Sequence, residues 1–263
     1  MGRINDIFAA LKDQGQTALM PFLTAGHPSL EITEATLRGL DSAGAHIVEI
    51  GIPFSDPIAD GPVIAAAMHQ ALVDGLHVDD VIAMAGRVRQ DTPLGLIAMV
   101  SSSIVEKRGA NAFLSQLKEA GFDGVIVPDI DTERADALLP IVDELDLAFA
   151  LLIAPTTTDQ RLDELLPRCR GFVYLLARAG LTGEQDHAPD IAGAVDRIRS
   201  RSTLPIAVGF GISSPEHVAA VTRHADAAIV GSAIVRRMSE ANDPATAACT
   251  YVATLAAGLS THS

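Results

Sequence analysis

Apolar residues along the chain follow two alternating spacings. Short, mostly apolar runs, typical of buried strands, are separated by segments in which apolar residues recur every three or four positions, typical of helices that face a core. The segment containing Leu138, Val142 and Leu145 is one such helical pattern. Eight runs are predicted to be strands: residues 18–24, 46–50, 95–100, 124–127, 147–153, 171–176, 205–208 and 227–230.

Strands that alternate with helices predict parallel pairing, because parallel neighbours need a crossover connection. Eight such units close naturally into a barrel. An open doubly wound sheet is the alternative, but the first turn here reads TAGHPSL and lacks a GxGxxG pattern. Ile4, Ile7, Phe8 and Leu11 add an amphipathic helix before the first strand. We predict an α/β fold, a (β/α)8 TIM barrel with an extra N-terminal helix, in which residues 1–263 form a single domain.

Composition agrees with this fold and narrows the class of partners. The 263 residues are 48% hydrophobic, enough apolar material for a large core. The formal net charge of −14, from 33 acidic and 19 basic residues, argues against general electrostatic binding of nucleic acid or an anionic membrane. No apolar run approaches 18 residues, the N-terminus lacks a signal-peptide pattern, and the cysteines and histidines match no metal-ligand spacing. We therefore expect a cytoplasmic protein without a metal site.

One acidic residue stands inside a predicted strand. In HIVEIGIP, alternation places Glu49 on one face with Ile47 and Gly51, while Val48 and Ile50 lie on the other. The aliphatic face should pack on the helices, so Glu49 is expected to point into the barrel. A buried ion pair is the alternative, but the neighbouring strands offer no obvious inward Lys or Arg. An inward carboxyl group without a basic partner should have a raised pKa suited to proton transfer.

Two further acids follow this strand, in FSDPIADGP. Asp56 precedes a proline and Asp60 precedes Gly-Pro, so both fit turn residues on a stiff loop. For Asp56 the turn interpretation is favoured. The spacing alone leaves the role of Asp60 open.

Glycine-rich turns follow the seventh and eighth predicted strands, in VGFGIS and IVGSAI. Gly211 and Gly231 allow a ligand to approach the backbone, and Ser232 offers a hydroxyl and an N–H at a helix start. Two tight turns are the structural alternative, but this is where TIM barrels frequently bind phosphate. Such a site uses N–H dipoles, which explains how an acidic chain can hold an anion. The long connection 178–189 fits a lid over the ligand.

Several motifs together resemble one enzyme family. VEIGIPFSDPIADGP, YLLARAGLTG, GFGIS, IVGSAIV and MPFLTAGHP are similar to the tryptophan synthase alpha subunit, and the similarity spans nearly the whole chain. The resemblance implies cleavage of indole-3-glycerol phosphate to indole and glyceraldehyde 3-phosphate, with no metal or organic cofactor in this subunit.

The resemblance also assigns roles to individual residues. It implies that Glu49 transfers protons at the glycerol hydroxyl and the indole C3 region, and that Asp60 hydrogen-bonds the indole N–H and stabilises the positively charged ring. Thr182 falls on the lid residue that closes near Asp60. The other implied substrate contacts are Phe22 and Tyr174 in the pocket, and Gly183, Phe210, Gly211, Gly231 and Ser232 around the phosphate.

The family works as a complex, so the resemblance implies a partner. A pyridoxal-phosphate beta subunit is expected in an α2β2 assembly, with indole passing to it through a tunnel. Asp56 and Pro57 then belong to the contact surface. Asp56 is then both a turn residue and part of the surface that contacts the beta subunit.

The chain also departs from the family pattern. Where the family commonly has MxYxNP, this chain has MVSSSIVEKRG, and Ser101 stands near the missing tyrosine. The indole pocket is therefore wider or is completed by another side chain. Asp131 occupies a place often held by proline, whereas Asp129 is kept. Two rival functions remain: a barrel enzyme acting on another sugar phosphate, and a subunit that mainly activates a beta partner.

Overall fold

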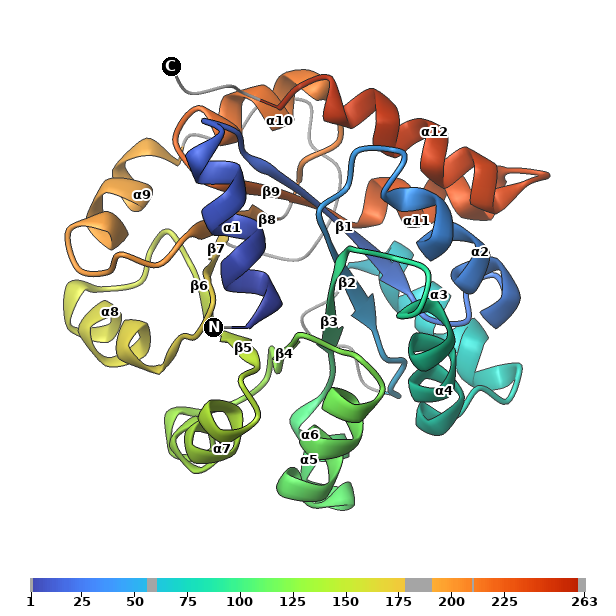
Figure 1. Ribbon diagram of the computed structural model, residues 1–263, viewed down its shortest axis with the longest axis horizontal. Coiled ribbons are helices and arrows are strands. Elements are labelled where there is room, and N and C mark those ends of the chain that lie inside the picture. The colour runs from blue at the N-terminus through green and yellow to red at the C-terminus, as the bar shows by residue number, and fades with distance from the viewer. Residues whose placement is uncertain (1, 56–60, 178–190, 210, 260–263) are drawn as a thin grey trace.

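Parallel strands form a nearly closed barrel (Figure 1). The computed structural model describes residues 2–55, 61–177, 191–209 and 211–259. The sheet order is β5-β4-β3-β2-β1-β9-β8-β7-β6, and every strand pair within it is parallel. The strands in the described residues are β1 Ala18–Thr24, β2 Ile47–Gly51, β3 Gly95–Met99, β4 Gly124–Ile126, β5 Ala148–Ala150, β6 Leu152–Ile153, β7 Val173–Leu176, β8 Ile206–Gly209 and β9 Ala227–Val230.

The fifth predicted strand is divided between the two ends of this sheet. β5 pairs with β4, β6 pairs with β7, and Leu151 alone separates β5 from β6. One continuous run therefore joins the first and last strands of the sheet, which closes the barrel. The predicted α/β barrel is confirmed, with this run as two short strands.

Helices surround the barrel, as Figure 1 shows. None of the helices in the described part of the chain is long and apolar enough to cross a membrane. The described helices are α1 Arg3–Asp13, α2 Leu30–Leu40, α3 Pro62–Val73, α4 Val78–Val88, α5 Ser102–Arg108, α6 Ala110–Glu119, α7 Thr132–Glu144, α8 Asp159–Leu165, the 3-10 turn η1 Leu166–Arg168, α9 Ala192–Arg199, α10 Pro215–Thr222, α11 Ser232–Glu240 and α12 Pro244–Ala256.

Alternation along each strand divides the core into two parts. Ile47 packs in the barrel interior, whereas Val48 and Ile50 pack in the layer between barrel and helices. The predicted alternation of the second strand is therefore confirmed.

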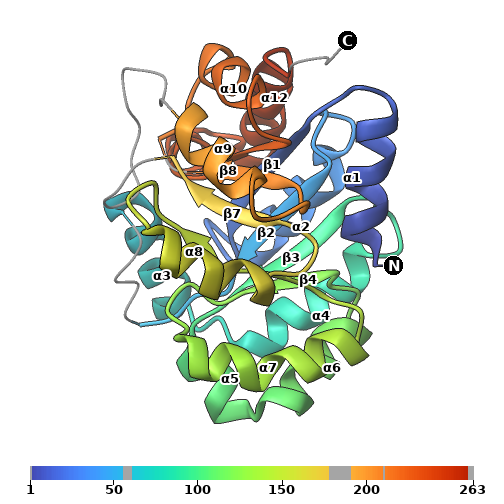
Figure 2. The same ribbon diagram turned by 90° about the vertical axis from the view of Figure 1, so that its left-hand side faces the viewer.

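The N-terminal helix closes the amino-terminal end of the barrel (Figure 2). Its buried side chains Ile4, Phe8 and Leu11 join the interior cluster, and the Phe8 ring lies 6.1 Å from that of Phe172. Helical spacing put these three side chains on one face, and that face covers the strand ends. The predicted extra helix thus forms the floor of the barrel interior.

Candidate active site

Glu49 is a fully buried acid near the carboxyl end of β2. Its exposed fraction is 0%, and neither carboxyl oxygen has a hydrogen-bond partner among the described residues. Burial alone raises the pKa of Glu49 to about 8. At neutral pH the carboxyl group is therefore mainly protonated. Its pKa lies about one unit above neutral pH, so the deprotonated form is also accessible, which suits a group that gives and takes protons.

The surroundings of Glu49 are apolar. On the neighbouring strands, Phe22 and Ile97 stand in register with Glu49. An apolar cluster lies at the same end of the barrel, and it joins β1 to α3 and α11. Its buried members are Phe22, Ile64, Ala67, Met68 and Val235.

The Phe22 ring lies between two glycines. A methyl group at Gly51 would stand 2.6 Å from Cζ of Phe22, and one at Gly231 would stand 3.4 Å from Cβ and Cδ1. Phe22 therefore lies next to Gly51, on the strand that carries Glu49, and next to Gly231, in the turn after β9. The predicted pocket residue Phe22 is thus placed beside Glu49.

Tyr174 is buried in the interior on β7. Its hydroxyl lies against Gly209, at the end of β8, where any side chain would overlap it. The structure thus brings Tyr174 to the turn after β8, which the sequence predicts to bind phosphate.

The predicted phosphate turns lie side by side, because β8 pairs with β9. Gly211 has a φ of +79°, a conformation that favours glycine. α11 begins at Ser232, directly after Gly231, so its first N–H groups lie at the carboxyl end of the barrel. This is the geometry with which helix starts bind anions.

Six predicted site residues lie outside the described residues: Asp56, Pro57, Asp60, Thr182, Gly183 and Phe210. Their assignments remain predictions.

The serines after β3 form a network that the sequence analysis missed. Ser101 is 3% exposed, and its hydroxyl contacts Ser103 Oγ at 2.8 Å and Asp129 Oδ2 at 3.2 Å. The Ser102 N–H and hydroxyl donate to the same Asp129 carboxylate at 2.8 and 2.9 Å. Asp129 thereby holds the start of α5. A serine run before an apolar helix is an N-cap pattern, and it is the feature from which this network could have been predicted.

Asp131, the other departure in this region, caps α7. Its carboxylate accepts a hydrogen bond from the N–H of Arg134 at 2.8 Å. Asp131 thus forms an ordinary helix N-cap.

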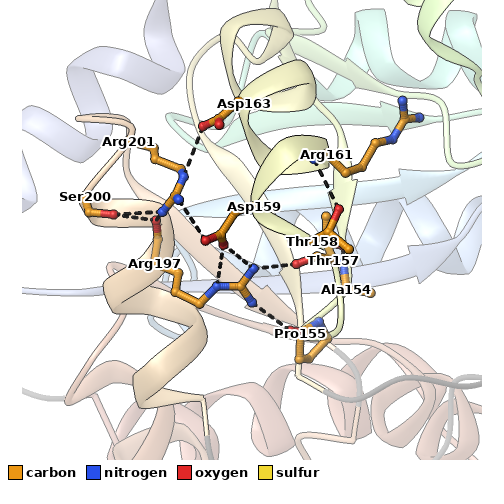
Figure 3. Close-up of polar contacts among 10 residues, drawn as sticks. All are labelled: Ala154, Pro155, Thr157, Thr158, Asp159, Arg161, Asp163, Arg197, Ser200 and Arg201. Atoms are coloured by element: carbon orange, nitrogen blue, oxygen red, sulfur yellow. Dashed lines mark hydrogen bonds and ion pairs between the residues drawn. The ribbon is translucent and has the colours of Figure 1, made fainter.

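Arg197 of α9 fixes the loop that follows β6 (Figure 3). Its guanidinium donates to the carbonyl oxygens of Pro155 at 3.3 Å and Thr157 at 2.6 Å, and to Asp159 at 2.7 Å. Hydrogen bonding from Arg197 keeps the pKa of Asp159 below its ordinary value. One side chain therefore joins α9, the loop and the start of α8 at the carboxyl end of the barrel.

Arg197→Met is expected to lower the free energy of unfolding by about 1–2 kcal/mol, because it removes charged hydrogen bonds to two loop carbonyls. Urea denaturation measures the change. Arg161→Met is the matched control, since among the described residues its side chain pairs with exposed Glu164 at 2.8 Å and with no backbone carbonyl, and it should cost less than about 0.5 kcal/mol. Equal losses in the two variants would contradict a special role for Arg197.

The fold and the site together define a class of protein: a TIM barrel with a buried acid at the carboxyl end of its strands, the end at which TIM-barrel enzymes carry their active sites. The model of the family "Tryptophan synthase alpha chain" matches residues 8–262, so the chain belongs to that family. The alpha chain of Rippkaea orientalis (strain PCC 8801 / RF-1) is 42% identical over 242 residues, 91% of each chain. That of Synechococcus elongatus (strain ATCC 33912 / PCC 7942 / FACHB-805) is 43% identical over 242 residues, with the same coverage.

Solved structures agree. A Mycobacterium tuberculosis tryptophan synthase chain superposes with a TM-score of 0.91 at 31% identity, covering 100% of this chain and 99% of the other. The alpha subunit from Legionella pneumophila str. Paris gives 0.88 at 33% identity, covering 98% of each. The protein is accordingly a lyase that cleaves indole-3-glycerol phosphate in tryptophan biosynthesis. The family uses no cofactor in this chain, and pyridoxal phosphate belongs to the beta subunit.

Proposed function

We propose that residues 1–263 act as one TIM-barrel domain in which Glu49 performs both proton transfers of the cleavage. The observation that carries this proposal is the burial of Glu49 in the interior without a polar partner among the described residues. Its pKa of about 8 leaves both the acid and the carboxylate accessible near neutral pH.

The reaction then proceeds in two balanced steps. Neutral Glu49 first donates its proton to C3 of the indole ring, and the ring nitrogen takes up the positive charge. Asp60 accepts a hydrogen bond from the indole N–H and stabilises that charge. The Glu49 carboxylate next removes the proton of the glycerol hydroxyl at the carbon bonded to C3. The carbon–carbon bond breaks, its electrons neutralise the ring, and indole and glyceraldehyde 3-phosphate leave with Glu49 protonated again.

Binding of the phosphate relies on backbone N–H groups. Gly211, Gly231 and the first turn of α11 at Ser232 supply them, and this arrangement suits a chain of net charge −14. Gly183 and Phe210 complete the phosphate contacts. Phe22 and Tyr174 line the pocket, and Thr182 closes near Asp60.

We further propose that the chain assembles with a tryptophan synthase beta subunit as α2β2, with Asp56 and Pro57 in the contact surface. Indole then passes through a tunnel to the pyridoxal phosphate of that partner. The solved homologue from M. tuberculosis is described as tryptophan synthase, which supports this assembly. Two free cysteines, Cys169 and Cys249, suit a reducing compartment and support a cytoplasmic location.

Release of indole from indole-3-glycerol phosphate by the purified chain tests the reaction and the role of Asp60. Asp60→Asn is expected to lower kcat at least about tenfold, because a neutral amide stabilises the charged ring less well than a carboxylate. Asp13→Asn, at the end of α1, is the control and should leave kcat unchanged. Near-normal turnover by Asp60→Asn would contradict its role.

The same assay with added beta subunit separates the rival functions. Turnover of a different sugar phosphate without indole release would favour another barrel enzyme. Absence of cleavage with and without the partner, together with faster turnover by the beta subunit, would favour a mainly activating subunit. Formation of α2β2, measured by analytical ultracentrifugation, tests the assembly separately from catalysis.

A further inference from the structure

Three buried oxygens at the carboxyl ends of β1 and β2 have no hydrogen-bond partner among the described residues. They are both carboxyl oxygens of Glu49 and the hydroxyl oxygen of Thr24. Folded proteins pair nearly all buried polar atoms, so unpaired oxygens that lie together at the end of the barrel where TIM-barrel enzymes bind substrate are candidates for contact with the substrate. Thr24 has no place in the acid–base mechanism above.

Other buried threonines show that Thr24 is unusual. The hydroxyls of Thr33, Thr36 and Thr222 donate to backbone carbonyl oxygens at 3.0, 2.8 and 2.9 Å. Each lies in a helix and bonds the carbonyl four residues earlier. Thr24 ends a strand and is only 2% exposed, and its hydroxyl has no partner within the part of the chain that the structure describes.

Alternation turns Thr24 into the barrel. Along β1, Met20 belongs to the interior cluster, whereas Leu19 and Leu23 belong to the outer layer. Thr24 shares the parity of Met20 and of Phe22, which packs beside Glu49. Its hydroxyl therefore lies on the same side of the sheet as the Glu49 carboxyl.

Strand register brings the two groups within reach of one ligand. Phe22 pairs with Glu49 and Thr24 pairs with Gly51, so Thr24 stands one inward position closer to the mouth on the adjacent strand. Neighbouring strands are about 4.8 Å apart, and two residues along a strand span about 6.6 Å, so the Cα atoms of Thr24 and Glu49 lie roughly 8 Å apart. Side chains lean along the strand direction, and an oxygen bound between the two groups can contact both.

We propose that Thr24 is a further catalytic residue, whose hydroxyl donates a hydrogen bond to the substrate hydroxyl that gives its proton to Glu49. This rests on the proposed role of Glu49. A substrate hydroxyl both donates and accepts: its proton goes to the carboxylate, and its oxygen accepts from Thr24. That oxygen gains negative charge as the carbon–carbon bond breaks, so the donor stabilises the transition state more than the ground state.

Thr24→Val tests the hydroxyl, because valine keeps the branched shape and removes only the donor. We expect a fall in kcat for indole release of at least about tenfold, with KM changed less than about threefold. The melting temperature should stay within a few degrees, because the hydroxyl has no partner to lose. Thr24→Ser keeps the donor and should retain kcat within about threefold.

Thr36→Val is the matched control, since it removes a buried hydroxyl from α2, and it should leave kcat unchanged. If Thr24→Val does not fold, Thr24→Ala replaces it and should show the same fall in kcat. A kcat of either variant within twofold of the unsubstituted chain would overturn the proposal, as would equal losses in Thr24→Ser and Thr24→Val. Full activity of Glu49→Gln would instead overturn the mechanism on which it rests.

Discussion

Glu49→Gln is expected to lower kcat for indole release roughly a thousandfold, because glutamine neither donates to C3 nor accepts the hydroxyl proton. Size and burial are kept, so phosphate-ligand binding and association with the beta subunit should remain. Steady-state kinetics, with isothermal titration of glyceraldehyde 3-phosphate, separates the two effects. Glu144→Gln, on the exposed face of α7, is the control and should be fully active. Activity of Glu49→Gln within tenfold of the unsubstituted chain would refute the assigned role.

The same variant gives an independent readout in the pH dependence of stability. The pKa of Glu49 is about 8 in the folded chain against an ordinary 4.5. Below pH 4.5 both states hold the proton; between pH 4.5 and 8 only the folded state does, so stability falls as pH rises. Relative to the glutamine variant, the total loss by pH 8 is on the order of 5 kcal/mol. If the free energy of unfolding depends on pH in the same way for the unsubstituted chain and for Glu49→Gln, the pKa of Glu49 is not raised by folding.

Gly51→Ala is expected to lower kcat/KM roughly a hundredfold, a cost typical of misplacing a catalytic group by about 1 Å. The new methyl would stand 2.6 and 2.8 Å from Cζ and Cε2 of Phe22 and 3.3 Å from Cε of Met68. The Phe22 ring must move to relieve this overlap, and Phe22 also lies beside Gly231, where an added Cβ would stand 3.4 Å from it. The displacement therefore affects both Glu49 and the phosphate turn.

A second substitution checks that the ring is the cause. The double variant Phe22→Leu/Gly51→Ala should lose less kcat/KM than the product of the losses in the two single variants, as expected for residues in contact. Gly193→Ala serves as the control, because a methyl there meets nothing within 4 Å. Independent effects of the two substitutions would argue against displacement of Phe22.

Sequence patterns predicted the barrel and the direction of Glu49 because both depend on periodicity. A period of two places a side chain inside or outside once the strand is recognised. The division of the fifth strand at Leu151 depends on which neighbour each half pairs with, and one strand's pattern does not contain that information. The contact of the Phe22 ring with Gly51 was likewise invisible, because it joins residues on different strands.

The two aspartates after β2 mark another limit. Turn chemistry favours a loop role for Asp56 but leaves Asp60 open, so only the family resemblance assigned a separate role to Asp60. The orphaned hydroxyl of Thr24 could not be predicted either, since the absence of a partner is a property of the folded interior.

The helix α1 at the floor of the barrel affects how the proton of Glu49 exchanges with solvent. Among the described residues, Ile4, Phe8 and Leu11 cover the amino-terminal end with apolar side chains, which disfavours entry of water into the interior from that side. We therefore expect the Glu49 proton to exchange with solvent at the carboxyl end, where the proposed mechanism places the substrate. In the proposed mechanism a bound substrate then shields the Glu49 carboxyl from solvent, and we expect the proton removed from the hydroxyl to stay in the site until a product departs.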